Sequence, residues 1–116
     1  MYKRRARLAF ASSSPGLAER ASRIAVMRGA DWVEAWPCPA GAVPPSCDLL
    51  VTLDALALAA RPYLPLGCRH AHWPLPESPT DADIAARVDG LVGGMRLLAR
   101  LDDSAAPKGR APDARN

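Results

Sequence analysis

The segment Asp48–Leu53 constrains the fold more than any other part of the chain, because it is almost entirely apolar. Its residues do not alternate between apolar and polar, as they would in a strand with one face in water. A short continuous apolar run is typical of a strand that is buried on both faces, and such strands belong to parallel sheets covered by helices. The segment therefore predicts a parallel α/β fold.

Composition agrees with one globular domain. The chain has 116 residues, of which 49% are hydrophobic and 23% charged, and its 12 prolines argue against a simple helical bundle. We expect a single domain over residues 1–103 and a disordered tail over residues 104–116, where the sequence is polar and contains Pro and Gly. No apolar run reaches the roughly 20 residues of a membrane span, so we expect a cytoplasmic protein.

Three further strands and three helices are predicted around this run. The strands are Arg7–Ala11, Trp32–Trp36 and Arg69–Trp73. Helices are expected to begin at Ser14–Pro15, at Asp54 and at the Thr80–Asp83 capping box. This order of elements predicts a parallel α/β sheet with helices on its faces. The three tryptophans are expected to be packing residues.

Charge and cysteine content exclude several classes of partner and cofactor. The net charge is +3, but the basic excess lies at the two ends of the chain and no aromatic residues interleave with it. We therefore expect neither nucleic acid nor a membrane as a partner. Cys38, Cys47 and Cys68 are too few and too scattered for a disulfide framework or a zinc site, and no cofactor is expected.

The turn between the first strand and first helix is the leading candidate for a binding site. Ligands of parallel sheets bind where the strands end and the helices begin. Hydroxyl and backbone N–H groups at a helix N-terminus attract anions. The candidate donors of this turn are Ser12, Ser13, Ser14 and Gly16. The alternative is that Ser14 only caps the helix.

A second candidate lies in the proline-rich loop after the fourth strand. Glu77 follows His70 and His72 in this region, and Asp81 comes just after the loop. Glu77 or Asp81 could act as a general acid beside an anion. The alternative is that Glu77 is a solvated carboxylate and Asp81 only marks a helix start. The His-x-His pair lacks a third ligand, so no metal site is expected.

Several of these segments together resemble the low-molecular-weight protein tyrosine phosphatases, and especially their thioredoxin-coupled arsenate reductase branch. The resemblance covers about residues 5–101. It rests on the order and spacing of Asp48–Leu53, Arg61–Pro65, His72–Pro79 and the closing helix Asp83–Leu101, and on Leu8–Ala11 followed by Ser14–Glu19. The resemblance implies a flavodoxin-like three-layer α/β/α domain with a four-stranded parallel sheet in the order 2-1-3-4, and a phosphate loop after the first strand.

The same resemblance shows that the family's nucleophile is missing. The family's loop has the form Cys-x5-Arg-Ser/Thr, in which the thiolate attacks phosphorus and the arginine holds the oxyanion. Aligned from the strand, the cysteine position is Ala11, and aligned from the helix it is Leu8. Ser14 occupies the arginine position in the helix alignment. The loop is therefore expected to be shortened by about three residues, without a thiol.

Other departures argue against the reductase reaction. The two further cysteine positions of that branch hold Asp54 and Arg61, and Glu77 with an inserted Ser78 replaces the Asp-Pro pair of the acid loop. The linker Pro37–Cys47 is too short to contain the family's second helix together with its connections, so we expect an extended crossing there.

The sequence thus predicts a catalytically degenerate relative of these phosphatases. We expect it to bind a phosphate-like anion or a protein partner at the turn after the first strand. The alternative is an active hydrolase of phosphoric monoesters that uses Glu77 or Asp81 as the acid and an activated water as the nucleophile.

Overall fold

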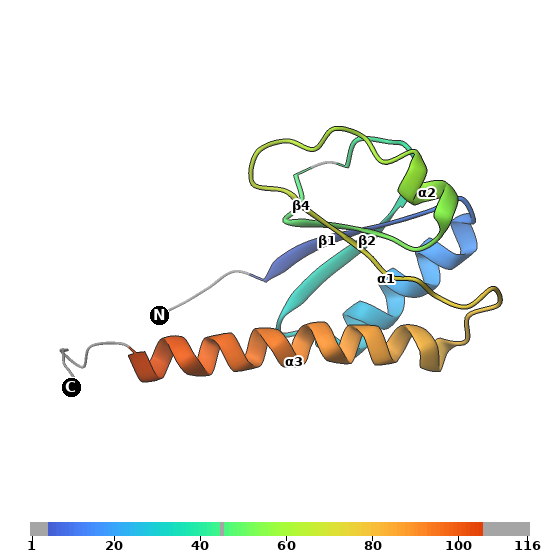
Figure 1. Cartoon of the computed structure of the whole chain (residues 1–116). Helices are drawn as coiled ribbons and strands as arrows, with labels where there is room; N and C mark the ends of the chain where they lie inside the picture. The colour runs from blue at the N-terminus through green and yellow to red at the C-terminus, as the bar shows by residue number, and fades with distance from the viewer. Residues whose placement is uncertain (1–4, 45, 106–116) are drawn as a thin grey trace.

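A four-stranded parallel sheet forms the centre of the molecule, with its strands in the order β2-β1-β3-β4 (Figure 1). The computed structural model describes residues 5–44 and 46–105. Its elements are β1 (Ala6–Ser12), α1 (Pro15–Gly29), β2 (Val33–Pro39), β3 (Leu49–Thr52), α2 (Ala55–Ala59), β4 (Arg69–His72) and α3 (Asp81–Ala105). The sheet and its strand order confirm the flavodoxin-like α/β fold that the sequence predicts.

Helices α1 and α3 cover one face of the sheet, and the short α2 lies on the other (Figure 1). Alternate residues of the central strands point to opposite faces. Leu8 and Phe10 of β1 pack toward α1 and α3, whereas Ala9 and Ala11 pack toward α2. In β1, large side chains thus face the two long helices and alanines face α2, while Leu50 of β3 is the large buried residue on the α2 side.

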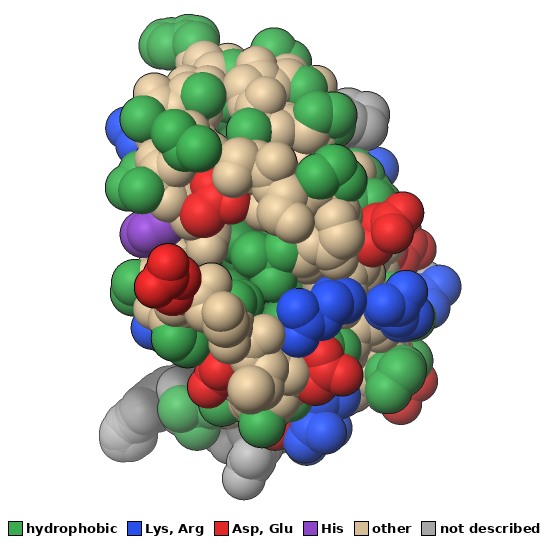
Figure 2. Space-filling view, turned by 90° about the vertical axis from the view of Figure 1, so that its right-hand side faces the viewer, with side chains coloured by type: hydrophobic (Ala, Val, Ile, Leu, Met, Phe, Trp, Pro, Cys, Tyr) green, Lys and Arg blue, Asp and Glu red, His purple; other side chains and the backbone are tan. Residues whose placement is uncertain are grey.

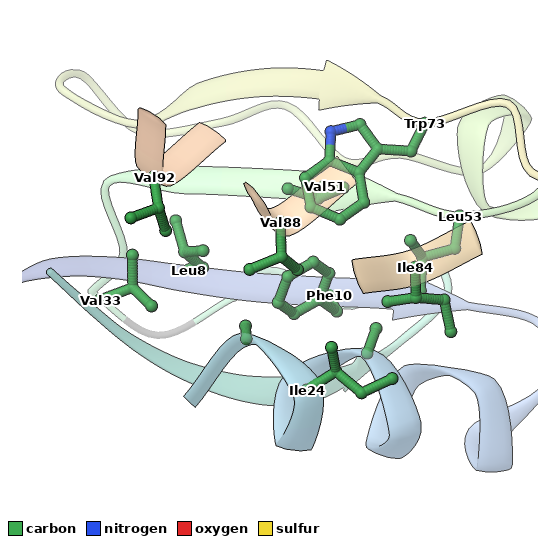
Figure 3. Packing of buried hydrophobic residues seen from close by; sticks show 12 residues of the cluster. Leu8, Phe10, Ile24, Val33, Val51, Leu53, Trp73, Ile84, Val88 and Val92 are labelled. Carbon is green, nitrogen blue, oxygen red and sulfur yellow. The ribbon is translucent and has the colours of Figure 1, made fainter. Parts of the chain in front are cut away.

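The main core lies between the sheet and the two long helices, as Figure 3 shows. Phe10 is fully buried, and its ring centroid is 5.4 Å from that of Trp73. Ile84 and Val88 of α3 point into the same cluster. Trp73 is thus a packing residue, as the sequence predicts. Trp32 and Trp36 are half-buried and pack against the two core clusters.

Helix α1 begins where its proline predicts, but its cap differs from the expectation. Ser14 is the N-cap and Pro15 follows it, yet the Ser14 hydroxyl makes no capping hydrogen bond. The Ser14 carbonyl instead accepts the N–H groups of Leu17 (3.1 Å) and Ala18 (3.2 Å), and the Ser14 N–H donates to the Ser12 hydroxyl (2.9 Å). Backbone groups therefore form the first turn of the helix.

The segment after Trp36 continues as strand, so the predicted boundary of β2 was too short. β2 runs to Pro39 and includes Pro37, which lacks a donor N–H group. A proline is tolerated here because β2 is an edge strand, which pairs on one side only. The described residues between β2 and β3 form no helix, in agreement with the expected extended crossing.

Helix α3 starts with the predicted capping box. The Thr80 N–H donates to the Asp83 carboxylate (2.8 Å), and the Asp83 N–H donates to the Thr80 hydroxyl (3.2 Å). The helix runs on to Ala105, beyond the predicted end at Leu101. Of the tail expected over residues 104–116, residues 106–116 lie outside the described part of the chain.

Gly29, the last residue of α1, marks a close approach between α1 and α3. A Cβ atom at this position would lie 2.8 Å from Val92 Cγ2 and 3.2 Å from Val33 Cγ2. Both valines are buried, so neither can move away freely. The sequence predicts Gly29 as a helix stop, whereas the structure shows that its missing side chain also lets the layers pack.

We predict that Gly29→Ala lowers the free energy of unfolding by about 1–2 kcal/mol, because overpacking outweighs the helix propensity of alanine. Gly90→Ala is the matched control, since nothing lies within 4 Å of a Cβ at that position of α3. It should raise the free energy of unfolding by about 0.5–1 kcal/mol. Urea denaturation measures both, and equal stabilisation by the two variants would contradict the close approach.

Candidate functional site

The carboxyl ends of β1 and β3 bring the Ser12–Gly16 turn next to the start of α2. The two strands pair in parallel with Ala11 opposite Thr52, and the Leu53 N–H donates to the Ala11 carbonyl (2.9 Å). Asp54 is the residue that follows, and its side chain reaches the turn. The parallel register therefore places a carboxylate against the hydroxyl and N–H groups of the candidate site.

The carboxylate of Asp54 accepts four hydrogen bonds. Its Oδ2 atom accepts from the Ser12 hydroxyl (2.7 Å), the Ser13 N–H (2.9 Å) and the Ser13 hydroxyl (3.1 Å). Its Oδ1 atom accepts from the Ala57 N–H (2.8 Å), which caps α2 as the sequence predicts. One carboxylate thus joins the turn after β1 to the first turn of the helix after β3.

These hydrogen bonds keep Asp54 ionised. Burial alone would raise the pKa of the Asp54 carboxyl, but the hydrogen bonds from Ser12, Ala57 and Ser13 together hold it below its usual value. Hydrogen bonds from neutral donors to a charged acceptor are stronger than those between neutral groups. Asp54 therefore carries a stable negative charge at the place where an external anion was expected.

The four predicted anion donors are not equivalent in the structure. Ser12 is buried and Ser13 is exposed, and both direct their hydroxyls at Asp54. Ser14 and Gly16 are exposed, and a Cβ at Gly16 would meet nothing within 4 Å. The turn therefore brings Ser12 and Ser13 together around Asp54, while Gly16 borders open space rather than a tight cradle.

The two candidate general acids, Glu77 and Asp81, differ in their contacts. Asp81 pairs with Arg20 of α1, whose Nη2 and Nε atoms are 2.9 and 3.1 Å from Asp81 Oδ1, and Arg20 also donates to the Pro79 carbonyl (2.9 Å). Arg20 thus ties the loop after β4 to α1. Glu77 is exposed in this loop, and no hydrogen bond or ion pair of its side chain occurs among the described residues.

A pocket of about 430 Å³ lies beside the turn, at the carboxyl ends of β1 and β2. Its lining is mostly apolar, and Glu19 is its one charged residue. The lining residues are Ser12, Ser13, Pro15, Ala18, Glu19, Pro37, Cys38, Pro39 and Ala40. Figure 2 views this edge of the molecule, where acidic and basic side chains surround apolar ones. The pocket suits an apolar group better than a free phosphate ion.

Cys38 is the thiol nearest to the candidate site, because it lines this pocket. Its sulfur contacts the carbonyl oxygens of Pro39 (3.6 Å) and Ala42 (3.8 Å), and burial raises the pKa of the thiol. A protonated thiol that points at carbonyl groups is a poor nucleophile. Cys38 does not replace the cysteine that the resemblance requires at Ala11 or Leu8.

The two histidines share one hydroxyl group instead of forming a metal site. Thr52 Oγ1 lies 2.9 Å from His70 Nε2 and 2.8 Å from His72 Nδ1. Burial, followed by the positive charges of Arg61 and His72, lowers the pKa of His70. Across residues 5–44 and 46–105, no group of three or more His, Cys, Asp or Glu residues could hold a metal ion. The cluster links β4 to β3.

From the sequence, Asp54 is expected to cap a helix and stands at a cysteine position of the reductase branch, but its contacts with the turn after β1 are not predicted. A signal was present, because the predicted order 2-1-3-4 makes the first and third strands neighbours. Residues that follow neighbouring parallel strands meet at one edge of the sheet. Two serines after one strand and an aspartate after the next are therefore a pattern from which the contact can be inferred.

No protein-family model matches the chain, and no curated protein matches it. Within the described residues, none of the helices is both long enough and apolar enough to cross a membrane. The fold and the geometry of the site therefore carry the functional argument.

We predict that Asp54→Asn lowers the free energy of unfolding by about 2 kcal/mol at pH 7. The amide must turn its NH₂ group toward either the Ser13 N–H or the Ala57 N–H, which leaves a donor facing a donor. Asp31→Asn, at an exposed position, is the control and should change stability by less than about 0.5 kcal/mol.

The stability difference between the wild type and Asp54→Asn should depend on pH. Because folding lowers the pKa of Asp54, its contribution is fully present above the unfolded value of about 4 and is lost as the pH falls through the folded value. The stability difference between wild type and Asp54→Asn should therefore narrow below about pH 4. Urea denaturation at several pH values measures this stability difference. A difference that stays constant with pH would contradict a lowered pKa of Asp54 in the folded protein.

Proposed function

We propose that the chain is a catalytically degenerate relative of the low-molecular-weight protein tyrosine phosphatases that binds a protein partner beside the turn after β1. The sequence resemblance and the flavodoxin-like fold with the strand order β2-β1-β3-β4 support the relationship. A shared fold implies no shared chemistry, so the reaction must be judged from the residues of the turn.

The observation that carries this proposal is the carboxylate of Asp54 in the turn. It takes up the hydroxyls of Ser12 and Ser13 and the Ser13 N–H, which are the donors that would otherwise bind a phosphate-like anion. Its negative charge also repels a second anion at the same place. The Asp54 carboxylate thus occupies the place at which an external anion would bind.

Among the described residues around the turn, no cysteine stands where the family's reaction needs its nucleophile. The positions at which the resemblance requires a cysteine are Ala11 and Leu8, both buried in β1. The nearby Cys38 thiol has a raised pKa, and Asp81 is engaged by Arg20. Loss of a covalent nucleophile removes orders of magnitude in rate. Binding is therefore favoured over hydrolysis.

The pocket beside the turn indicates the chemistry of the partner. Apolar walls from Pro15, Ala18 and Pro37 suit an aliphatic chain, and the carboxylate of Glu19 suits a positive charge at its end. A lysine side chain combines these two properties. We therefore propose that the partner protein inserts a lysine side chain into this pocket.

We predict that about 10 mM phosphate or arsenate changes the Tm of the wild type by less than about 1 °C and that aryl phosphates are not hydrolysed. In Asp54→Ala the turn donors lose their carboxylate, so phosphate should raise the Tm by about 2–4 °C. Differential scanning fluorimetry and release of the aryl alcohol measure these effects.

Two outcomes would contradict the proposal that Asp54 occupies the anion donors of the turn after β1. One is a phosphate-induced Tm rise in the wild type that equals that of Asp54→Ala, and the other is no rise in either protein. Aryl phosphate turnover that Glu77→Gln abolishes would favour the hydrolase with an activated water instead.

We predict that Nα-acetyl-lysine methylamide binds the pocket with millimolar affinity and shifts the backbone amide signals of Ala18, Glu19 and Ala40 in NMR spectra. Glu19→Gln should weaken this binding roughly 2- to 5-fold, because an exposed charge pair contributes about 1 kcal/mol or less. Nα-acetyl-norleucine methylamide, which lacks the amine, is the matched control. Shifts of equal size with both compounds would exclude recognition of the charge.

A further inference from the structure

Two cysteine thiols are in contact on the α2 side of the sheet, away from the candidate site. The Sγ atoms of Cys47 and Cys68 are 3.2 Å apart, although the residues are 21 positions apart in the sequence. Both cysteines are reduced and partly buried. The three cysteines are scattered in the sequence, and the fold brings Cys47 and Cys68 together.

The contact follows from the pairing of β3 with β4. Leu49 pairs with Arg69, and the Arg69 N–H donates to the Asp48 carbonyl (3.0 Å). Cys47 precedes Asp48 and Cys68 precedes Arg69, so the two thiols stand side by side at the amino ends of the strands. Backbone hydrogen bonds, and not flexible side chains alone, therefore hold the pair.

A tight turn just before β4 places Cys68 next to Cys47. The Cys68 N–H donates to the Pro65 carbonyl (3.1 Å), and Gly67 within the turn has a φ of 92°. This left-handed conformation favours glycine, which has no Cβ. The turn ends directly at β4 and fixes the approach of Cys68 to Cys47.

We propose that Cys47 and Cys68 form a reversible disulfide site that is oxidised by hydroperoxides. The sulfur atoms need to approach by only about 1 Å to reach the bonding distance of about 2.05 Å. This proposal rests on the paired thiols alone and is independent of the function proposed for the turn after β1.

The environment assigns different roles to the two thiols. Burial raises the pKa of Cys47 to about 12, and the hydrogen bond with Cys68 acts in the same direction. Burial thus makes Cys47 the poorer nucleophile, and Cys68, which directly follows the exposed residues 65–67, is the sulfur that attacks first. Cys38 is buried and lines the pocket beside the turn after β1, so it takes no part.

The oxidation proceeds in two balanced steps. The Cys68 sulfur attacks one peroxide oxygen and the O–O bond breaks. The hydroxide that leaves takes the thiol proton of Cys68, which gives Cys68 sulfenic acid and one water. The Cys47 sulfur then attacks the Cys68 sulfur, the S–O bond breaks, and hydroxide leaves as water with the Cys47 proton. Two thiols lose two electrons in total, and hydrogen peroxide gains them to give two water molecules.

The disulfide would close a ring that contains β3, Asp54 and α2. The same ring carries the segment with Tyr63 and Leu66, whose side chains are fully exposed. Cross-linking residues 21 positions apart restricts the unfolded chain, so oxidation should raise the Tm by roughly 10 °C. Reduction would release this constraint.

The test is treatment of the purified full chain with hydrogen peroxide, followed by intact mass and peptide mapping. We expect loss of two hydrogens, a peptide joined through Cys47 and Cys68, a rate independent of protein concentration, and full reversal by dithiothreitol. Oxidation without this linkage, a linkage that includes Cys38, or dimers in place of the intramolecular product would overturn the proposal. Mapping of the wild type decides this even if a variant fails to fold.

Variants separate the roles of the thiols. Cys38→Ala is the matched control and should form the disulfide at the rate of the wild type. Cys47→Ser should form none and should leave Cys68 as a sulfenic acid that dimedone traps, with the Tm rise abolished. Loss of two hydrogens that persists in Cys47→Ser, or dimedone labelling of Cys47 in Cys68→Ser at the rate seen for Cys68, would overturn the assigned roles.

Discussion

The carboxylate of Asp54 holds together the edge of the sheet at which a fold of this kind carries its site. Its hydrogen bonds reach Ser12 and Ser13 after β1 and Ala57 in α2. The end of β1 with the turn after it and the first turn of α2, which are distant in the sequence, thereby depend on one charged group. Because buried N–H and hydroxyl groups need partners, the turn keeps its shape only while this acceptor is present. An internal carboxylate makes the turn stable without a ligand and leaves the adjacent pocket as the open feature of this edge.

The two faces of the sheet differ in the kind of interaction that holds them. On the face of α1 and α3, large apolar side chains such as Phe10 and Trp73 interlock, and Gly29 permits the close approach of the helices. Two surface ion pairs, Arg20–Asp81 and Arg28–Asp89, join the same two helices. Such exposed pairs contribute little energy, so they fix the alignment of helices that apolar burial already holds together.

The α2 face has small side chains and polar or sulfur contacts in place of a thick core. Ala9, Ala11 and Ala57 lie at its centre, and Thr52 joins the two histidines of β4. A layer that buries little apolar area gains relatively more from a covalent link. The paired thiols of Cys47 and Cys68 lie on this face, where a disulfide would tie the edge strand β4 to β3.

The sequence by itself determined the parallel sheet, the cap of α2 and the capping box of α3, because each depends on local periodicity or on residues three positions apart, and its family resemblance gave the strand order. Only the tertiary structure decided the contact of Asp54 with the serines, the pairing of Asp81 with Arg20, and the meeting of Cys47 and Cys68. These contacts join residues 21 to 61 positions apart. They depend on strand register and on irregular segments such as the turn at Gly67, for which the sequence carries no periodic signal.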